Sequence, residues 1–299
     1  MAGENLIVKT ALIVNPAASR IPPAKKLRRA EAELNRRGFP VTVCPTSGPL
    51  EAVELARRAV GEGSELVISV GGDGTLNEVI NGIAGSPVRL GIIPAGLSNV
   101  LARELGIPED FDRALELIPA GFVRRIDIGQ VNGRYFSIMV SIGLDAEAVR
   151  IVNPAVKRFL KRYAYHLAGF QALAFFRADP FTLLLDGTGE VTGRAAVISN
   201  SRFYGGPHRI TPAARSDDGL LHCCVFEKGR RRDYARYFWG VLRKNHHRFP
   251  DVIFRTARTV EIGNPGLPIQ ADGDYVGQTP ARIRILPGSL SVLAPEKSE

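Results

Sequence analysis

The chain is poor in cysteine and has no long hydrophobic run. Only Cys44, Cys223 and Cys224 occur among 299 residues, and they form no C-x-x-C pair. This scarcity argues against a cysteine-based zinc site and favours a reducing compartment. No apolar run reaches the ~18 residues that a membrane-spanning helix needs. The first sixteen residues, MAGENLIVKTALIVNP, also lack the basic start, apolar core and cleavage site of a signal peptide, so we expect a cytoplasmic protein.

Acidic residues are the minority among the charged ones. Lys and Arg number 39 and Asp and Glu number 30, which gives a formal net charge of +9. The surface should therefore favour anionic partners such as nucleotides, nucleic acids or acidic lipids. No nucleic-acid recognition module is visible, so we expect no specific nucleic-acid partner. The length of the chain and its 45% apolar residues suffice for two domain cores.

Strands and helices are expected to alternate in the first part of the chain. Strands are expected at 10–16, 41–44, 65–70 and 89–94, and a helix is expected after each of them, at 24–37, 50–60, 76–84 and 99–106. This alternation predicts a parallel sheet that is covered by helices on both faces. Ligands of such sheets bind beyond the carboxyl ends of the strands, where Asn15, Thr46, Gly71 and Gly96 fall.

The pattern becomes mostly β after about residue 123. Two short strands flank the turn signal Asn132-Gly133. Further strands are expected at 181–186, 191–200, 220–226, 251–263, 267–277 and 281–295, interrupted by helices at 156–177 and 232–246. We therefore predict an α/β domain over residues 1–123 and a β-rich domain, sandwich-like or barrel-like, over residues 124–299.

A glycine-rich turn joins the third strand to its helix, in the run ELVISVGGDGTLNEVING. Gly71, Gly72 and Gly74 allow backbone N–H groups to approach an anion, and the N-terminus of the following helix adds partial positive charge. Asp73 would repel a bare phosphate, so its presence makes chemical sense if a divalent cation or a substrate hydroxyl also binds here. The run predicts a phosphate-binding turn, with a turn that binds nothing as the alternative.

Three later motifs follow this turn in a fixed order: PAGLSNVLARELGIP (94–108), TPAARSDDGLL (211–221) and ADGDYVG (271–277). With these four motifs the chain resembles the diacylglycerol kinase and sphingoid-base kinase superfamily, and it is similar to the bacterial soluble lipid kinases of that group. The GGDGT motif alone is shared with NAD kinases and 6-phosphofructokinases. The resemblance implies that residues 1–123 form a nucleotide-binding domain like that of these two enzyme families and that residues 124–299 form a lipid-substrate domain.

The resemblance also implies binding residues for ATP and magnesium. The residues implied for ATP are Asn15, Thr46, Gly71, Gly72, Asp73, Gly74, Thr75, Asn77, Gly96, Ser98 and Asn99. In the DDGLL segment the family binds magnesium through a side-chain carboxylate and backbone carbonyls, here Asp218 with Arg215 and Leu220, and oxygen ligands suit a hard cation. The alternatives are a helix cap at Thr46 and an Asp-Gly hairpin turn at Asp218.

The catalytic residues implied by the resemblance are Asp274 and Asp73. In the family an acid at the third position of the D-G-D element, usually glutamate, is proposed to take the proton from the lipid hydroxyl. Aspartate is shorter by one methylene, which moves the carboxylate by about 1.5 Å. Asp73 would help to place the metal or the acceptor, and Asp272 is expected to orient the loop. A plain hairpin turn is the alternative for this element.

Two positions depart from the family pattern. Leu97 stands where the family has threonine, and NPAASR lacks the glycine that often follows its Asn-Pro pair. A hydrogen bond lost to a charged phosphate is worth roughly 1.5–3 kcal/mol. We therefore expect weaker ATP binding, unless Ser98 supplies the missing hydroxyl.

Together these features predict an ATP- and magnesium-dependent kinase that phosphorylates diacylglycerol or a related long-chain lipid alcohol. Segment 228–248 has eight Lys and Arg, one acid and several aromatic residues, which favours peripheral membrane association with lipid substrate at the membrane surface. A solvated amphipathic helix is the alternative for this segment. The alternative functions are an NAD kinase-like enzyme with a soluble substrate and a non-catalytic nucleotide- or lipid-binding protein. A homodimer is left open.

Overall fold

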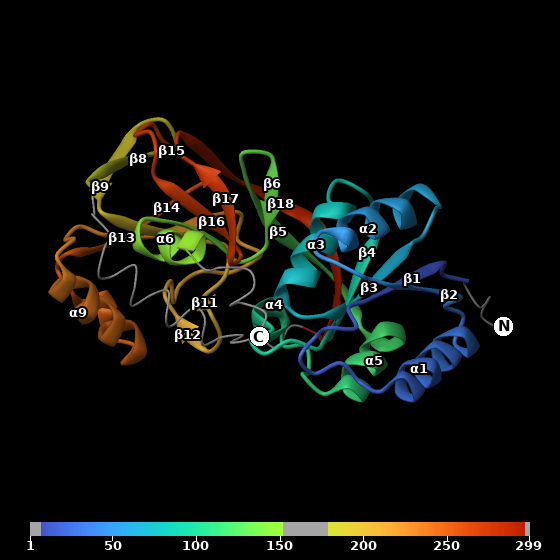
Figure 1. Cartoon of the computed structure of the whole chain (residues 1–299). Helices are drawn as coiled ribbons and strands as arrows, with labels where there is room; N and C mark the ends of the chain where they lie inside the picture. The colour runs from blue at the N-terminus through green and yellow to red at the C-terminus, as the bar shows by residue number, and fades with distance from the viewer. Residues whose placement is uncertain (1–6, 152–178, 297–299) are drawn as a thin grey trace. The chain divides into compact units, whose positions relative to one another are not determined.

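The computed structural model describes residues 7–151 and 179–296, which fold into two compact units (Figure 1). The first unit contains the chain up to Asp127 and the chain from Gly288 onward, and the second contains Ile128–Pro287. The helix expected at 156–177 lies outside the described residues. No helix in the two described ranges is long and apolar enough to cross a membrane.

Strands and helices alternate in the first unit in the predicted order. The elements are β1 (Thr10–Val14), α1 (Ala24–Arg36), β2 (Val41–Pro45), α2 (Glu51–Gly61), β3 (Leu66–Gly71), α3 (Asp73–Ile83), β4 (Arg89–Pro94), α4 (Val100–Leu105) and α5 (Phe111–Ala120). Helix α5 was not predicted; Asp110 caps it by accepting the N–H of Arg113. Helix α3 begins at Asp73, three residues before the predicted start at residue 76, because the first turn of the helix includes part of the glycine-rich turn.

The first unit is built on a parallel sheet with the strand order β2-β1-β3-β4. Residues Ser291 and Val292 of β18 (Ala281–Ala294) add a further parallel pairing beside β4. Figure 1 shows α2 and α3 on one face of this sheet and α1 and α5 on the other. Every residue of β1 and β3 is buried, as expected of strands covered on both faces. The predicted α/β fold is thus confirmed.

The second unit consists mostly of antiparallel strands. Its elements after β5 (Phe122–Val131) are β6 (Arg134–Phe136), β7 (Met139–Ile142), α6 (Leu144–Ile151), β8 (Phe181–Leu185), β9 (Gly189–Gly193), β10 (Ala195–Ser199), β11 (Phe203–Tyr204), β12 (His208–Arg209), β13 (Leu221–Phe226), α9 (Arg231–Leu242), the 3-10 helix η1 (His246–Arg248), β14 (Val252–Ala257), β15 (Thr259–Ile262), β16 (Pro268–Ala271) and β17 (Asp274–Gln278). The strand expected at 251–263 is two strands, because the N–H groups of Arg258 and Thr259 turn toward the carboxylate of Asp186. The strand expected at 191–200 likewise divides at Arg194, and α6 was missed.

Two layers of strands form the core of the second unit. One layer is a six-stranded sheet in the order β14-β13-β10-β7-β16-β17. The other contains β9, β8, β15 and residues 281–284 of β18. Buried side chains of both layers pack into one cluster that includes Val140, Ile198, Val225, Leu183, Val260 and Ile283. This arrangement confirms the predicted β-sandwich.

Candidate active site

Two loops at the carboxyl edge of the parallel sheet touch through their glycines. A Cβ atom added to Gly96 would lie 2.6 Å from the Cα of Gly72, and one added to Gly72 would lie 3.1 Å from the Cα of Gly96. The N–H of Ala95 also donates to the carbonyl of Gly71 at 2.7 Å. The turn after β3 and the loop after β4 therefore pack backbone against backbone, and only glycine allows this approach.

Asp73 joins the same two loops from its place at the start of α3. Its Oδ1 accepts the N–H of Val100 at 2.6 Å, and Val100 is the first residue of α4. The first N–H groups of a helix have no acceptor within the helix and carry partial positive charge, so a carboxylate is stabilised there. The prediction from the sequence is that Asp73 helps to place the metal or the acceptor. The structure adds a contact that holds the GGDGT turn to the PAGLSN loop.

Asn99 shapes the PAGLSN loop from within. It is buried, its φ is 46°, and its side chain closes on Gly96 by accepting the N–H at 2.9 Å and donating to the carbonyl at 3.1 Å. Asparagine tolerates this left-handed conformation better than most residues. Leu97 is 40% exposed and Ser98 is partly exposed, so the loop presents these two side chains toward solvent.

A hydrogen bond between Asn15 and Thr75 connects the segment after β1 to the glycine-rich turn. The Nδ2 of Asn15 donates to the Oγ1 of Thr75 at 2.8 Å, and its Oδ1 accepts the N–H of Ala17 at 2.9 Å. Thr75 and Asn77 are both buried, and the Nδ2 of Asn81 donates to the Oδ1 of Asn77 at 3.1 Å. Among the residues predicted for this turn, Gly72, Asp73 and Gly74 are the accessible ones.

Thr46 follows β2 at the same edge of the sheet, and its N–H donates to the carbonyl of Val14 at 2.8 Å. It does not cap α2, which was the alternative role. The first turn of α2 is instead capped from α3, where Glu78 accepts the N–H of Leu50 at 3.0 Å and of Ala52 at 3.2 Å. No local sequence signal identifies Glu78, because it lies more than twenty residues from the helix that it caps.

The DDGLL segment forms a tight turn that leads into β13. The Oδ1 of Asp218 accepts the N–H of Leu220 at 3.1 Å, and its Oδ2 lies 2.9 Å from the Nε2 of His222. Arg215 donates through Nε to Asp217 at 3.1 Å. Residues 7–151 and 179–296 contain no group of three or more His, Cys, Asp or Glu side chains that could hold a metal ion. A magnesium ion at this turn would therefore need backbone carbonyl oxygens as ligands in addition to Asp218. Each carbonyl oxygen has two lone pairs, so it can bind a cation and also accept a hydrogen bond.

The D-G-D element forms the turn between β16 and β17, with Asp272 at φ 48° and Gly273 at φ 87°. The carboxylate of Asp272 accepts the N–H groups of Ser137 at 2.7 Å, Ile138 at 3.0 Å and Met139 at 2.9 Å. Burial raises the pKa of Asp272, although these hydrogen bonds oppose the rise. Asp272 thus holds the turn to the segment before β7, as expected of a loop-orienting residue.

Asp274 extends from the end of the same turn and forms an ion pair. Its Oδ2 lies 2.8 Å from the guanidinium of Arg134 on β6, and its side chain is 36% exposed. The sequence analysis missed Arg134, which is 140 positions away in the chain. The carboxylate is therefore accessible and held in one orientation.

A polar network that includes the buried side chains of Gln270 and Ser141 lies next to this turn, and it was not predicted from the sequence. Gln270 accepts the N–H of Gly273 at 2.8 Å, and its Nε2 donates to Ser141 at 2.8 Å and to Asp145 at 3.0 Å. The other oxygen of Asp145 accepts the hydroxyl hydrogen of Tyr204. Burial, with the charge of Asp145, raises the pKa of Tyr204 well above its usual value, so this hydroxyl remains a donor. The network fixes the backbone between Asp272 and Asp274.

The comparisons with known proteins agree with the two units of the fold. Residues 9–131 match the diacylglycerol kinase catalytic domain, and residues 138–294 match the YegS C-terminal NAD kinase beta sandwich-like domain. The chain is also similar to a solved structure, that of a putative diacylglycerol kinase from Bacillus anthracis, with a TM-score of 0.80 and 24% identity over 98% of this chain and 97% of that one. At that identity the likeness shows the fold.

Two relatives show the family. The diacylglycerol kinase of Mycobacterium tuberculosis is 32% identical over 300 residues, covering 97% of this chain and 96% of that one. The diacylglycerol kinase of Staphylococcus aureus is 32% identical over 294 residues, covering 96% of this chain and 92% of that one. The chain therefore belongs to the diacylglycerol kinase family, and it is a kinase that phosphorylates an alcohol.

Proposed function

We propose that this protein transfers the γ-phosphoryl group of ATP to the hydroxyl of diacylglycerol or of a related long-chain lipid alcohol. The observation that carries the proposal is the contact between Gly72 and Gly96, with Asp73 bound to the N–H of Val100. It brings two helix N-termini and an acid together at the carboxyl edge of a parallel sheet, where nucleotides bind in such folds.

The proposed ATP site uses the accessible part of this pair of loops. Backbone N–H groups at Gly72, Asp73 and Gly74 would donate to phosphate oxygens, because the first turn of a helix leaves them without an acceptor in the helix. Leu97 offers no hydroxyl beside them. We expect Leu97→Thr to lower the Kd for ATP by about tenfold or more, since a hydrogen bond to a charged group is worth roughly 1.5–3 kcal/mol. Calorimetric titration with ATP would measure it, and an unchanged Kd would assign the missing donor to Ser98.

The proposed magnesium ligands are the carboxylate of Asp218 and the carbonyls of Arg215 and Leu220. Their oxygens fit a hard cation, and the Asp218 side chain is 23% exposed, so it remains accessible to one. When bound, magnesium supplies positive charge that offsets the charge of phosphate groups. The imidazole of His222 already contacts the Asp218 carboxylate, so replacing His222 should alter the affinity of this site for magnesium.

Asp274 is the proposed general base. The lipid hydroxyl would transfer its proton to the Asp274 carboxylate while its oxygen bonds to the γ-phosphorus, and the bond between that phosphorus and the ADP oxygen breaks. Arg134 would orient the carboxylate for this transfer through the ion pair at 2.8 Å. The base is one methylene shorter than the usual glutamate, so its position depends on the turn that Asp272 and Gln270 hold.

The test is phosphorylation of diacylglycerol vesicles by the purified chain with labelled ATP and magnesium. Asp274→Asn should lower kcat by about 10²–10⁴-fold, as removal of a general base does. Glu54→Gln is the matched control, because Glu54 is an exposed acid on α2 and its side chain is 71% exposed. Equal activity of wild type and Asp274→Asn would remove Asp274 from its role. Activity only on NAD would support an NAD kinase-like enzyme, and ATP binding without turnover would support a non-catalytic protein.

A further inference from the structure

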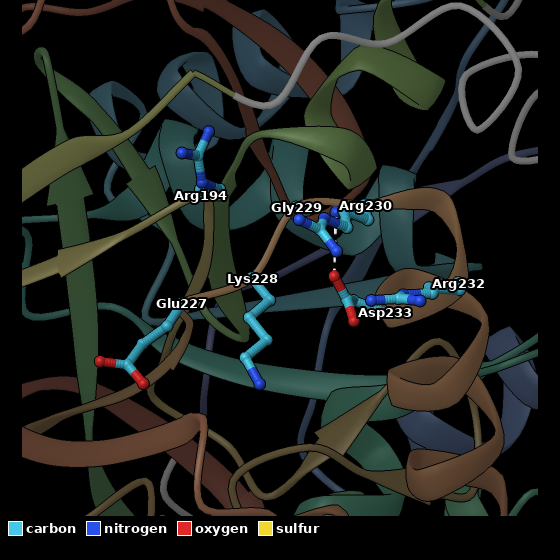
Figure 2. Close-up of a pocket in the computed structure, with 7 residues that line it drawn as sticks. All are labelled: Arg194, Glu227, Lys228, Gly229, Arg230, Arg232 and Asp233. Atoms are coloured by element: carbon cyan, nitrogen blue, oxygen red, sulfur yellow. Dashed lines mark hydrogen bonds between the residues drawn. The ribbon is translucent and has the colours of Figure 1, made fainter.

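A basic pocket opens at the N-terminus of α9 in the second unit. Its volume is about 500 Å³. Four of the side chains that line it are cationic and two are acidic: Arg194, Lys228, Arg230, Arg232, Glu227 and Asp233. Figure 2 shows them around the turn between β13 and α9.

The acids near this pocket offset only part of its positive charge, because four cationic side chains line it and only two acidic ones do. The carboxylate of Asp233 is buried and accepts the N–H of Arg230 at 3.1 Å, so it serves to cap α9 (Figure 2). Asp251 lies 3.7 Å from the Nζ of Lys228 and also pairs with Arg236, so one carboxylate serves two cations. Arg230 and Arg232 are exposed, and no carboxylate of the described residues forms an ion pair with either guanidinium. The pocket therefore carries excess positive charge.

The same helix presents two aromatic side chains to solvent. Phe238 and Trp239 are each 55% exposed, whereas Tyr237 between α9 and the sandwich is 3% exposed. They follow Arg231 and Arg232 by seven residues, which is about two helical turns and places them on the same side of α9. An exposed apolar pair beside exposed cations is typical of elements that lie on a membrane surface.

We propose that α9 is the membrane-docking element of this protein. Its pocket takes the phosphate headgroup of an anionic phospholipid, and Phe238 and Trp239 enter the headgroup region of the bilayer. Tryptophan favours this region because its ring is apolar and its N–H needs a partner. Arginine and lysine are attracted by an anionic surface, in accord with the net charge of +9. The inference rests on the proposed function, since a lipid kinase meets its substrate at a bilayer. To that function it adds that α9 is the surface that contacts the bilayer and that the bound phospholipid is anionic.

Trp239 reports directly on this docking, because it is the single tryptophan of the chain. The full chain is titrated with phosphatidylglycerol vesicles and, in parallel, with phosphatidylcholine vesicles. With the anionic vesicles the emission of Trp239 should shift to shorter wavelength and its quenching by acrylamide should fall. With the neutral vesicles neither should change. An emission spectrum that phosphatidylglycerol leaves unchanged would overturn the proposal.

Variants of exposed residues separate the pocket from general charge. The pair Arg230→Glu and Arg232→Glu should weaken binding to the anionic vesicles by about 25-fold or more, at about fivefold for each basic residue. The pair Arg57→Glu and Arg58→Glu on α2 changes the net charge equally at side chains that are 58% and 60% exposed. This control should bind much more tightly than the pocket variant. Equal weakening in both would overturn the role of the pocket.

The aromatic pair is tested in the same assay. Phe238→Ala should weaken vesicle binding, whereas Phe122→Ala, which removes a ring that is 54% exposed on β5, should leave it unchanged. A parallel titration with inorganic phosphate distinguishes binding to a bilayer from binding of a soluble anion. If phosphate alone reproduces the shift of Trp239, the pocket is a site for a soluble anion and the proposal is wrong.

A final measurement distinguishes the failure of this inference from the failure of the proposed function. The docking variants should lose activity on diacylglycerol in anionic vesicles and keep it on a short-chain diacylglycerol dissolved as monomers. If the docking variants lose both activities, impaired docking is not the cause of the loss and the proposal is wrong. A wild-type chain that phosphorylates neither lipid would overturn the proposed function, while the fluorescence result would still decide whether α9 docks.

Discussion

Gly96→Ala is the sharpest test of the loop contact on which the proposed ATP site depends. The new Cβ would lie 2.6 Å from the Cα of Gly72 and 2.7 Å from the Oδ1 of Asn99. Ordinary contacts of this kind begin near about 3.5 Å, so the two loops must separate by roughly 0.9 Å. Overpacking of this kind costs about 1–3 kcal/mol of unfolding free energy. A domain of this size loses roughly 2–4 °C of Tm for each kcal/mol.

Thermal unfolding and the KM for ATP are the two measurements for this variant. Gly61→Ala is the matched control, because nothing lies within 4 Å of a Cβ added at the end of α2. We expect Gly96→Ala to lower Tm by several degrees and to raise the KM for ATP, and Gly61→Ala to do neither. A Tm equal to that of the control would refute the packing argument. A lower Tm with an unchanged KM would refute the role of this contact in ATP binding.

Three further predictions follow from buried polar groups. Asn99→Ala should cost about 2 kcal/mol in urea unfolding, because it removes two hydrogen bonds to Gly96 and places alanine at φ 46°; a loss below about 0.5 kcal/mol would contradict this. Burial lowers the pKa of His246, so stability that is present above about pH 6.5 should fall as the pH drops below that value, and His246→Gln but not His247→Gln should reduce this dependence. Asp272→Asn should destabilise the chain by about 1–3 kcal/mol at pH 7. The carboxylate accepts backbone N–H groups through both of its oxygens, whereas the NH2 group of asparagine cannot accept a hydrogen bond, and unchanged urea unfolding would refute this.

The parallel sheet and the strand-end loops could be predicted because their signals are local. An apolar run before Gly71 and a helical pattern after Thr75 identify a strand, a turn and a helix within a short window. The β-rich character of the second unit was visible for the same reason. The start of α3 at Asp73 was missed because glycine disfavours a helix interior yet is tolerated in its first turn.

The contacts that complete the candidate site could not be read from the sequence, because they join distant positions. Arg134 reaches Asp274 across 140 positions, and Gln270 reaches Asp145 across 125. Neither arginine nor glutamine at such positions carries a motif of its own. Arg134 and Asp274 lie on strands of different sheets, and Asp145 lies on α6, so each contact depends on how these elements pack in the folded chain.

The return of the chain to the first unit has a consequence for dissecting the protein. Ser291 and Val292 of β18 supply the strand next to β4, and Leu290, Val292 and Ala294 are buried there. A fragment that stops after the first continuous stretch would leave the edge of β4 that faces β18 unpaired, and it would lack the apolar side chains that β18 adds to the core of this unit. Such an open β-edge favours association with other chains. Expressing residues 1–127 alone should therefore give an aggregating product unless this C-terminal segment is fused back to it.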